Sequence, residues 1–265
     1  MKYIAFSALS AAALAACGGS GSGESFVQVG PAAAMLGPSE VDVEITPSGD
    51  TITVVKSGGV ATAATDTAPD NGTFKTAYDT TGDYTLAFVS TGDGSVAGGT
   101  SFKDGADYDS GIFYARTETT ALPEAGSASF AGDYLGMLVI PSTEVSVFGL
   151  GITGDAALSV DFGAQTVSGM ITGRELVLLT TGDAVDGSSV ADLTLAETAL
   201  GADGGFAGSG SGGAYSTTTD TSTTSAISYE GLIAGATAEE AVGGVSVTHS
   251  IGGTALEIGA FAAGH

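Results

Sequence analysis

The acidic stretch KDGADYDSG at 103–111 has the residue types that could most readily hold a metal ion. It places Asp104, Asp107 and Asp109 close together, and carboxylate oxygens are ligands that Ca²⁺ prefers. The calcium loop of an EF-hand, however, has acidic residues at alternate positions, then glycine, then a late glutamate. Because the spacing here is different, we expect a solvated acidic turn and no bound metal or other cofactor.

Catalysis through an activated nucleophile would need a histidine beside a serine, cysteine or carboxylate, and the chain has two histidines. His249 falls in an alternating stretch, on the same face as Val245 and Val247, so we expect it to pack in the core. His265 is the last residue of the sequence. No Ser-His-Asp set can be assembled, and no pair of carboxylates stands out for glycoside hydrolysis. We therefore expect no catalytic residues and no enzyme, with a hydrolase as the minor alternative.

The single cysteine, Cys17, stands directly after an apolar run at 4–16 that Lys2 precedes. A run of this length is too short to span a bilayer, which needs roughly 20 apolar residues. It fits the hydrophobic region of an export signal, which is roughly 7–15 residues long. Residues 1–16 are therefore predicted to be a signal peptide.

The residues at the end of that run are Leu14, Ala15 and Ala16, followed by Cys17. Together they resemble the bacterial lipobox, in which the cysteine sulfur is diacylglycerylated and the chain is cut before it. Acyl chains of this kind anchor a protein to a membrane. The alternative is an ordinary secretory signal with an incidental cysteine.

A flexible Gly/Ser-rich tether follows the cysteine, so residues 17–25 are interpreted as the lipidated cysteine and its linker. The next residue is Gly18, whereas an aspartate there would resemble the inner-membrane retention signal. We expect a lipid anchor in the outer membrane at the cell surface, with the periplasmic face as the alternative.

The composition excludes several classes of protein. The formal net charge is −24 with only six basic residues, which argues against nucleic acid as a partner because phosphate contacts need Lys and Arg. Glycine is abundant at 43 residues and tryptophan is absent, without the period of three that collagen requires. Short alternating runs of Val, Ile, Leu, Phe and Tyr between turn residues indicate an all-β protein.

The chain divides at a linker-like stretch, TTALPEAGS at 119–127. Residues 26–121 are expected to form a small irregular β-domain, with strands near 41–47, 51–56 and 111–118. Residues 122–265 are expected to form an eight-stranded antiparallel soluble β-barrel. An open sandwich and a transmembrane barrel are the alternatives to the soluble barrel. The predicted barrel strands are 127–140, 154–162, 165–173, 190–199, 204–211, 226–234, 242–250 and 255–263.

One pattern favours the closed barrel. An apolar residue repeatedly stands two positions before a glycine, on the same face of its strand. We expect a neighbouring aromatic ring to cover the notch at each glycine, which would let the strand bend as small barrels require. The pairs are Phe130/Gly132, Tyr134/Gly136, Val167/Gly169, Phe206/Gly208 and Tyr229/Gly231.

Four segments in the second half occur in the order and spacing of a known group. They are LPEAGSASFAGDYLG (122–136), GDAALSVDFGAQTVSGMITGR (154–174), YEGLIAGATAEEAVGGVSV (229–247) and ALEIGAFAAGH (255–265). Together they resemble the transferrin-binding protein B-like β-barrel family. Thr237, Glu239 and Glu240 in the third segment are expected near the start of a single helical turn.

The resemblance implies a surface lipoprotein of a Gram-negative bacterium, built as a "handle" β-domain followed by a barrel. Members of the group bind transferrin, complement factor H or haem-bearing proteins. This chain would have one handle–barrel unit instead of two lobes, so transferrin is not carried over as its ligand.

Two long connections contain the residues that we single out as ligand contacts. In PSTEVSVFGLGITG (141–154) these are Val145, Val147, Phe148 and Leu150, and in the Thr/Ser-rich stretch 212–226 the contact is Tyr215. The first connection is either an extra strand, which the alternation favours, or an apolar loop tip.

The sequence thus predicts a binding module for an extracellular or periplasmic protein or solute, with nutrient, iron or haem acquisition as the process. An outer-membrane translocator or receptor is a further candidate partner. The alternative is a structural or protective envelope lipoprotein without a specific ligand.

Overall fold

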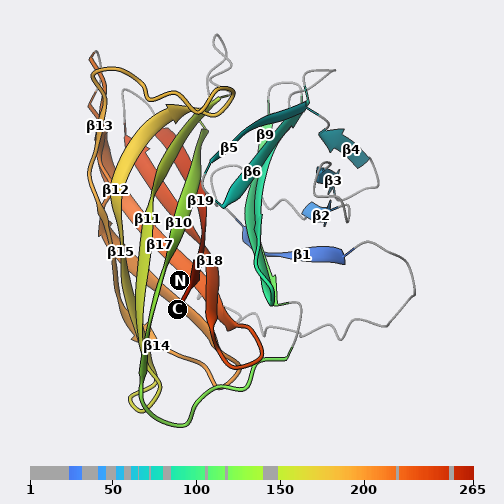
Figure 1. The fold of residues 1–265 in the computed structure, drawn as a ribbon. Helices are drawn as coiled ribbons and strands as arrows, with labels where there is room; N and C mark the ends of the chain where they lie inside the picture. The colour runs from blue at the N-terminus through green and yellow to red at the C-terminus, as the bar shows by residue number, and fades with distance from the viewer. Residues whose placement is uncertain are drawn as a thin grey trace, which may run out of the picture.

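The computed structural model describes residues 24–31, 41–45, 52–56, 61–64, 66–71, 73–79, 85–104, 107–116, 119–139, 149–218, 221–250 and 254–265. The chain is all-β over these ranges, with a nine-stranded sheet, a closed barrel and a small two-stranded sheet (Figure 1). No helix in these ranges has the length and hydropathy needed to cross a membrane.

The first half forms the nine-stranded antiparallel sheet, here called the handle sheet, in the order β4-β3-β2-β1-β9-β8-β7-β6-β5. Its strands are β1 (Glu24–Pro31), β2 (Val41–Ile45), β3 (Ile52–Lys56), β4 (Ala61–Ala64), β5 (Asp66–Asn71), β6 (Phe74–Asp79), β7 (Thr85–Thr91), β8 (Ser95–Asp104) and β9 (Asp107–Arg116). The first strand pairs with β9 through a register shift between Gln28 and Pro31. The predicted irregular N-terminal β-domain is confirmed.

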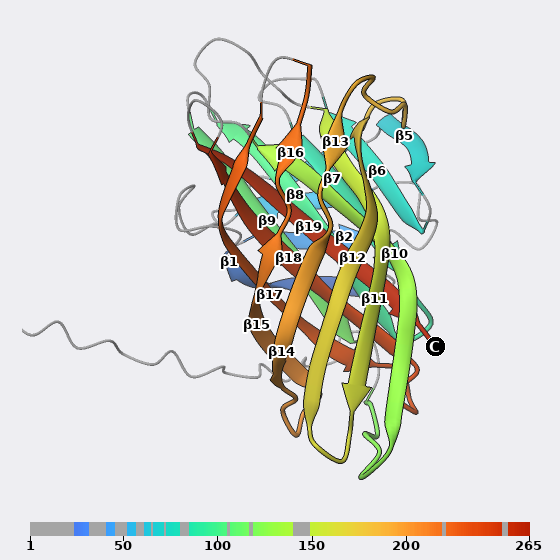
Figure 2. The ribbon, with the colours of Figure 1, turned by 90° about the vertical axis from the view of Figure 1, so that its left-hand side faces the viewer.

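The second half forms the predicted closed antiparallel barrel of eight strands, in which the last strand pairs with the first. The strands are β10 (Ser127–Val139), β11 (Leu150–Asp161), β12 (Thr166–Leu178), β14 (Leu193–Ala199), β15 (Gly205–Gly212), β17 (Thr223–Ala234), β18 (Glu240–Ser250) and β19 (Thr254–Gly264). Two short strands, β13 (Ser189–Val190) and β16 (Tyr215–Ser216), pair with each other. Figure 2 faces the wall made by β11, β12 and β14.

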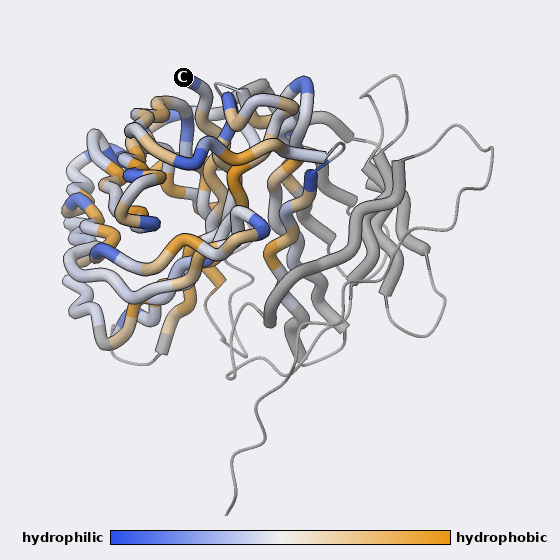
Figure 3. The backbone as a smooth tube through the Cα atoms, turned by 90° about the horizontal axis from the view of Figure 1, so that it is seen from below, coloured by the Kyte–Doolittle hydropathy of each residue, from blue (hydrophilic) through white to orange (hydrophobic). Residues whose placement is uncertain are grey.

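The barrel interior is filled by alternate side chains of each strand, as period-2 patterning requires. Leu158, Val160 and Phe162 lie inside the barrel and are almost fully buried. Val245 and Val247 also lie inside and are fully buried. The view along the barrel shows apolar and polar segments following one another along the tube (Figure 3). The interior is therefore a packed core of the kind expected for eight strands.

The outer face of β19 is also apolar. Leu256, Ile258 and Ala260 share a face, as the alternation predicts, and that face points out of the barrel. It packs with Met137 against the handle sheet, where Phe88 is one of the buried contacts. Strands β8 and β9 thereby cover β18 and β19, which lie on the handle side of the barrel in Figure 1.

The prediction that aromatic rings of neighbouring strands cover the glycines is confirmed between β15 and β17. Phe206 is the register partner of Gly231, and Tyr229 is the partner of Gly208. A Cβ atom on Gly231 would lie 2.6 Å from the Phe206 ring, and one on Gly208 would lie 2.7 Å from the Tyr229 ring. These two rings therefore occupy the notches, and their centroids lie 6.3 Å apart.

The same prediction is wrong at two other glycines. A Cβ atom on Gly132 would meet the backbone of Ala262, and one on Gly169 would lie 2.7 Å from the carbonyl oxygen of Ala157 with leucine side chains beyond it. Close approach of a neighbouring strand's backbone, and not an aromatic ring, explains glycine at these positions.

The helical turn predicted around Thr237, Glu239 and Glu240 is also wrong. Gly235 has φ 78° and Ala238 has φ 63°, and a right-handed helix cannot include left-handed residues. The segment is a tight hairpin connection that ends where β18 begins at Glu240. The carboxylate of Glu239 accepts hydrogen bonds from the Thr237 N–H at 2.6 Å and hydroxyl at 2.9 Å, which stabilises this turn.

Candidate functional site

A β-bulge turns one of the few basic side chains into the barrel. Thr153 pairs with Glu175, whereas Asp155 pairs with Thr172, so β12 has one residue more than β11 between these pairs. The bulge contains Gly173 with φ 59°, a conformation that glycine adopts without strain. Because an extra residue inverts the alternation, Arg174 points inward and is buried.

Arg174 meets three other strands in a polar cluster inside the barrel. The Glu257 carboxylate accepts a hydrogen bond from the Tyr134 hydroxyl at 2.5 Å and forms an ion pair with Arg174 Nη2. Its second oxygen lies 3.0 Å from His249 Nε2. Arg174 Nη1 donates to the carbonyl oxygen of Ala191 at 2.7 Å. We call Tyr134, Arg174, His249 and Glu257 the lumen cluster.

The charges in the lumen cluster compensate one another. Burial opposes ionisation of Glu257, but the Arg174 charge and the contact with His249 outweigh it and lower its pKa to about 2. Burial, followed by the Glu257 charge, raises the Tyr134 pKa well above its ordinary value. Burial acts against the charge on Arg174 as well, but Glu257 raises its pKa overall. The cluster therefore holds a carboxylate–guanidinium pair at neutral pH.

The lumen cluster is closed to substrates. The side chains of Arg174, His249 and Glu257 are all 0% exposed, and Tyr134 is 1% exposed. A catalytic group must reach the proton it transfers, and here the Glu257 carboxylate is held by Tyr134, Arg174 and His249 away from solvent. The arrangement is suited to fixing four strands in register, not to chemistry on a ligand.

His249 lies in the core, as its alternation predicts, with the Tyr215 ring edge-on at 5.0 Å. The sequence reasoning missed its polar partners. Glu257 is an isolated charge inside a continuous apolar strand, and Arg174 follows a glycine in a strand of a chain poor in basic residues. Both features could have indicated a buried pair, because buried charges are normally paired.

A second polar region lies where the handle sheet meets the barrel. Glu240, at the start of β18, accepts hydrogen bonds from the N–H groups of Asp93 at 2.9 Å and Gly94 at 3.3 Å, and from the Ser95 hydroxyl. On another edge, Arg116 Nη1 donates to the carbonyl oxygen of Asp203 at 2.7 Å. These contacts hold handle-sheet turns and strand ends against the barrel.

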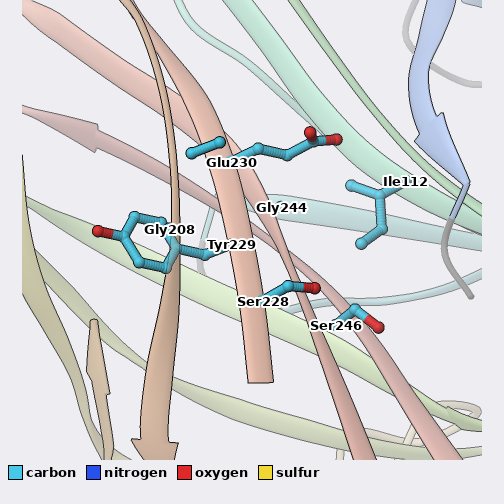
Figure 4. Close-up of a pocket in the computed structure, with 8 residues that line it drawn as sticks. Ile112, Gly208, Ser228, Tyr229, Glu230, Gly244 and Ser246 are labelled. Carbon is cyan, nitrogen blue, oxygen red and sulfur yellow. The ribbon is translucent and has the colours of Figure 1, made fainter. Parts of the chain in front are cut away.

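A cavity of about 190 Å³ opens beside this junction. Outward-facing residues of β17 and β18 form one side of it, and Ile112 of β9 faces them across the gap (Figure 4). The barrel side presents the Glu230 carboxylate and the hydroxyls of Ser228 and Ser246, whereas the Tyr229 ring points the other way. We call this space the junction cavity.

The junction cavity contains a carboxylate that the fold does not neutralise. Burial raises the pKa of Glu230, and a hydrogen bond from the Tyr114 hydroxyl opposes that shift. Burial, with a further contribution from Glu230, raises the pKa of Tyr114 above its ordinary value. In the part of the chain that the structure describes, no lysine or arginine pairs with Glu230. The cavity can therefore offer one acceptor-rich, negatively charged group to a ligand.

The ligand contacts singled out in the sequence lie elsewhere. Val145, Val147 and Phe148 fall outside the described residues, as does the lipobox. Leu150 begins β11, is half-buried and pairs with Leu178. Tyr215 is buried at 4% exposure in the barrel core. Their assignment as ligand contacts stays a prediction.

The described residues contain no group of three or more His, Cys, Asp or Glu that could hold a metal ion. Asp104 and Asp107 form the last pair of the β8–β9 hairpin, so the acidic stretch does lie at a chain reversal. The structure does not describe the side chains of Asp104, Asp107 and Asp109, so the solvated turn stays a prediction.

No family model and no curated protein matches the chain. Among solved structures, a mutant form of transferrin binding protein B from Haemophilus parasuis is 12% identical with a TM-score of 0.39, and the match covers 86% of this chain and 51% of that one. The same protein from Neisseria meningitidis is 13% identical with a TM-score of 0.35, covering 85% and 51%. A protein of unknown function from Nostoc punctiforme is 9% identical with a TM-score of 0.27, covering 92% and 94%.

The motifs in the second half of the sequence thus predicted the family whose structures the comparison returns. This chain spans about half the length of the transferrin binding protein B chains that it matches, with 51% of the Haemophilus parasuis chain covered. The likeness concerns the fold, and no ligand follows from it.

Proposed function

We propose that the chain is an outer-membrane-anchored lipoprotein that acts as a non-enzymatic binding module. The observation that carries the proposal is a difference between the two polar regions. The charges of the lumen cluster satisfy one another inside the barrel, whereas the junction cavity leaves the Glu230 carboxylate facing an open space. A carboxylate that borders a cavity and has no basic partner among the described residues is a group that a ligand can use.

The proposed anchor is Cys17, with Leu14, Ala15 and Ala16 before it, and residues 17–25 as the tether. The handle-like domain at 26–121 and the barrel domain at 122–265 would then stand clear of the membrane. The cell surface is the proposed location, and uptake of a nutrient is the proposed process. Iron and haem are included among such nutrients.

The proposed ligand is an extracellular or periplasmic protein or a small solute. An outer-membrane translocator or receptor is the proposed partner for export or uptake. Two of the proteins reported above, from Haemophilus parasuis and Neisseria meningitidis, are named for binding transferrin. Transferrin itself is not part of the proposal, since a likeness at 12–13% identity concerns the fold and not a ligand.

Protease shaving of intact cells followed by mass spectrometry tests the location. We expect an acylated peptide that begins at Cys17, and barrel peptides released from whole cells. Barrel peptides that appear only after lysis would place the protein in the periplasm. An unmodified Cys17 peptide with an uncut N-terminus would overturn the anchor.

A matched variant sharpens this test. Cys17→Ser removes the only thiol in the chain and so the only site for the thioether link to lipid. We expect the variant to leave the outer-membrane fraction. Unchanged fractionation of Cys17→Ser would contradict the lipoprotein proposal.

A structural or protective envelope lipoprotein is the second candidate. The loop between β12 and β13, at one end of the barrel, favours it, because its polar residues Thr180, Thr181, Asp183 and Asp186 face solvent. The two candidates differ in whether any ligand stabilises the purified protein, since ligand binding to the folded state raises its melting temperature.

A further inference from the structure

We propose that the junction cavity binds small organic ammonium ions, with Glu230 as the group that recognises the charge. This inference rests on the proposed function as a binding module and names the chemical class of its ligand. It starts from the position of Glu230 on the outer face of β17, half-buried between the barrel and β9 of the handle sheet.

The charge in the cavity selects a cation. The Glu230 carboxylate accepts one hydrogen bond from Tyr114 and has no basic partner among the described residues. Partial burial of the Glu230 charge without a basic partner costs free energy. An ammonium group bound beside the carboxylate would compensate this cost. The net charge of −24 on the whole chain also attracts cations and repels anions.

The other groups in the cavity fit an ammonium ion better than a metal. An ammonium nitrogen has three hydrogens to donate. The Glu230 carboxylate and the hydroxyl oxygen of Ser228 are acceptors on the same wall. Calcium would need six to eight oxygen ligands, and no group of three acidic or other metal-ligating side chains occurs among the described residues.

The size of the cavity restricts the ligand to a small molecule. Its volume of about 190 Å³ is below the roughly 300–1,000 Å³ of pockets that enclose drug-sized compounds. Ile112 provides an apolar wall beside the carboxylate, against which a short alkyl group can pack. A two- or three-carbon ammonium ion, with or without a hydroxyl, satisfies both the charge and the shape.

The test is a titration of the full-length protein, purified in detergent, with ethanolammonium chloride. A ligand with so few atoms binds with a Kd on the order of 1 mM. Ethanolammonium at about 100 mM should therefore raise Tm by about 5 °C or more beyond sodium chloride of equal ionic strength. Ethylene glycol, the neutral analogue of similar size, should have no such effect.

Glu230→Gln is the decisive variant, because glutamine keeps the shape and the acceptor for Tyr114 and removes the charge. We expect it to weaken ethanolammonium binding at least tenfold. Glu197→Gln is the matched control, since Glu197 is an exposed carboxylate on β14, outside the cavity, and should leave the affinity unchanged. Ser228→Leu should also abolish binding by filling the cavity while the Glu230 charge remains.

Equal Tm shifts from ethanolammonium and sodium chloride would overturn the inference. So would an unchanged affinity in Glu230→Gln. Neither result bears on protease shaving, which decides the anchored location by itself. Failure of this inference is thus distinguishable from failure of the proposed function.

Discussion

The two sides of the barrel wall follow different rules of burial. On the side of the barrel that the handle sheet leaves open, buried and exposed residues alternate along β11. Ala156, Leu158 and Val160 are buried, and the residues between them are exposed. On the side that the handle sheet covers, every residue of β19 from Ala255 to Phe261 is buried. Both strands belong to one closed antiparallel sheet. The difference arises only from what lies outside the barrel.

The amino-acid sequences of the two strands reflect this difference in burial. A strand with one solvated face alternates apolar and polar residues, whereas a strand covered on both faces becomes nearly continuous in apolar and small residues. The open strand reads AALSVD at 156–161 and the covered strand reads ALEIGAFAA at 255–263. Glu257 is the one charge in the covered strand, and it joins the two walls by reaching Arg174 of the open wall across the interior.

The largest predicted effect on stability comes from breaking the ion pair between Glu257 and Arg174. Glu257→Leu leaves the Arg174 guanidinium buried without a counter-charge, which should lower the free energy of unfolding by about 3–5 kcal/mol. Urea unfolding followed by circular dichroism measures this loss. A change below about 1 kcal/mol would mean that the walls do not depend on the pair.

The double variant Arg174→Met with Glu257→Leu is its control. Replacing both charges with apolar side chains of similar size is often neutral or stabilising. We expect the double variant to recover most of the stability lost in Glu257→Leu. Additive losses would show that the cost is one of packing and not of charge.

The same pair predicts how stability depends on pH. The pKa of Glu257 is about 2 in the folded protein and is lower than in the unfolded chain. Its contribution is therefore present above about pH 4.5 and is lost as the pH falls toward 2. The difference corresponds to about 3 kcal/mol.

Unfolding measured from pH 6 to pH 2 in the wild type and in Glu257→Gln tests this prediction. The stability gap between the two should narrow as the pH falls. The exposed Glu197→Gln variant should keep the wild-type dependence. A gap that stays constant down to pH 2 would contradict the assignment of the buried charge to Glu257.

The covered and open walls can also be compared by matched truncations on their outer faces. Ile258 is fully buried under the handle sheet, whereas Met170 on the open wall is 44% exposed. Ile258→Ala should cost about 2 kcal/mol or more through lost burial and a cavity. Met170→Ala should change stability by less than about 0.5 kcal/mol. Equal effects would mean that the handle sheet does not stay packed on the barrel in solution.

The sequence was sufficient for the eight barrel strands, because period-2 patterns and turn residues are local. All eight barrel strands overlap the predicted ranges, and the rings of Phe206 and Tyr229 cover glycines as predicted. The lumen cluster was not predictable in this way, since the inward direction of Arg174 depends on a bulge at Gly173 that inverts the alternation.

The junction cavity was missed for a related reason. Glu230 stands beside Tyr229 in an alternating strand, and the pattern places it on the solvent face. Only the docking of β9 turns that face into a cavity wall. The contact with β9, which is far away in the sequence, left no local signal around Glu230.

The smallest predicted effect concerns how the covered wall is attached. Glu240 accepts hydrogen bonds from the turn at Asp93, Gly94 and Ser95, which joins β7 to β8 in the handle sheet. Hydrogen bonds to a charged acceptor are stronger than neutral ones, so Glu240→Ala should cost about 1–2 kcal/mol. Amide hydrogen exchange should accelerate at residues 92–95 and remain unchanged in β11 and β12. Glu239→Ala is the matched control, because the Glu239 carboxylate accepts hydrogen bonds from Thr237 within its own turn. Equal acceleration of exchange on both walls in Glu240→Ala would contradict this prediction. The contact would then stabilise the whole barrel and not only the attachment of the handle sheet.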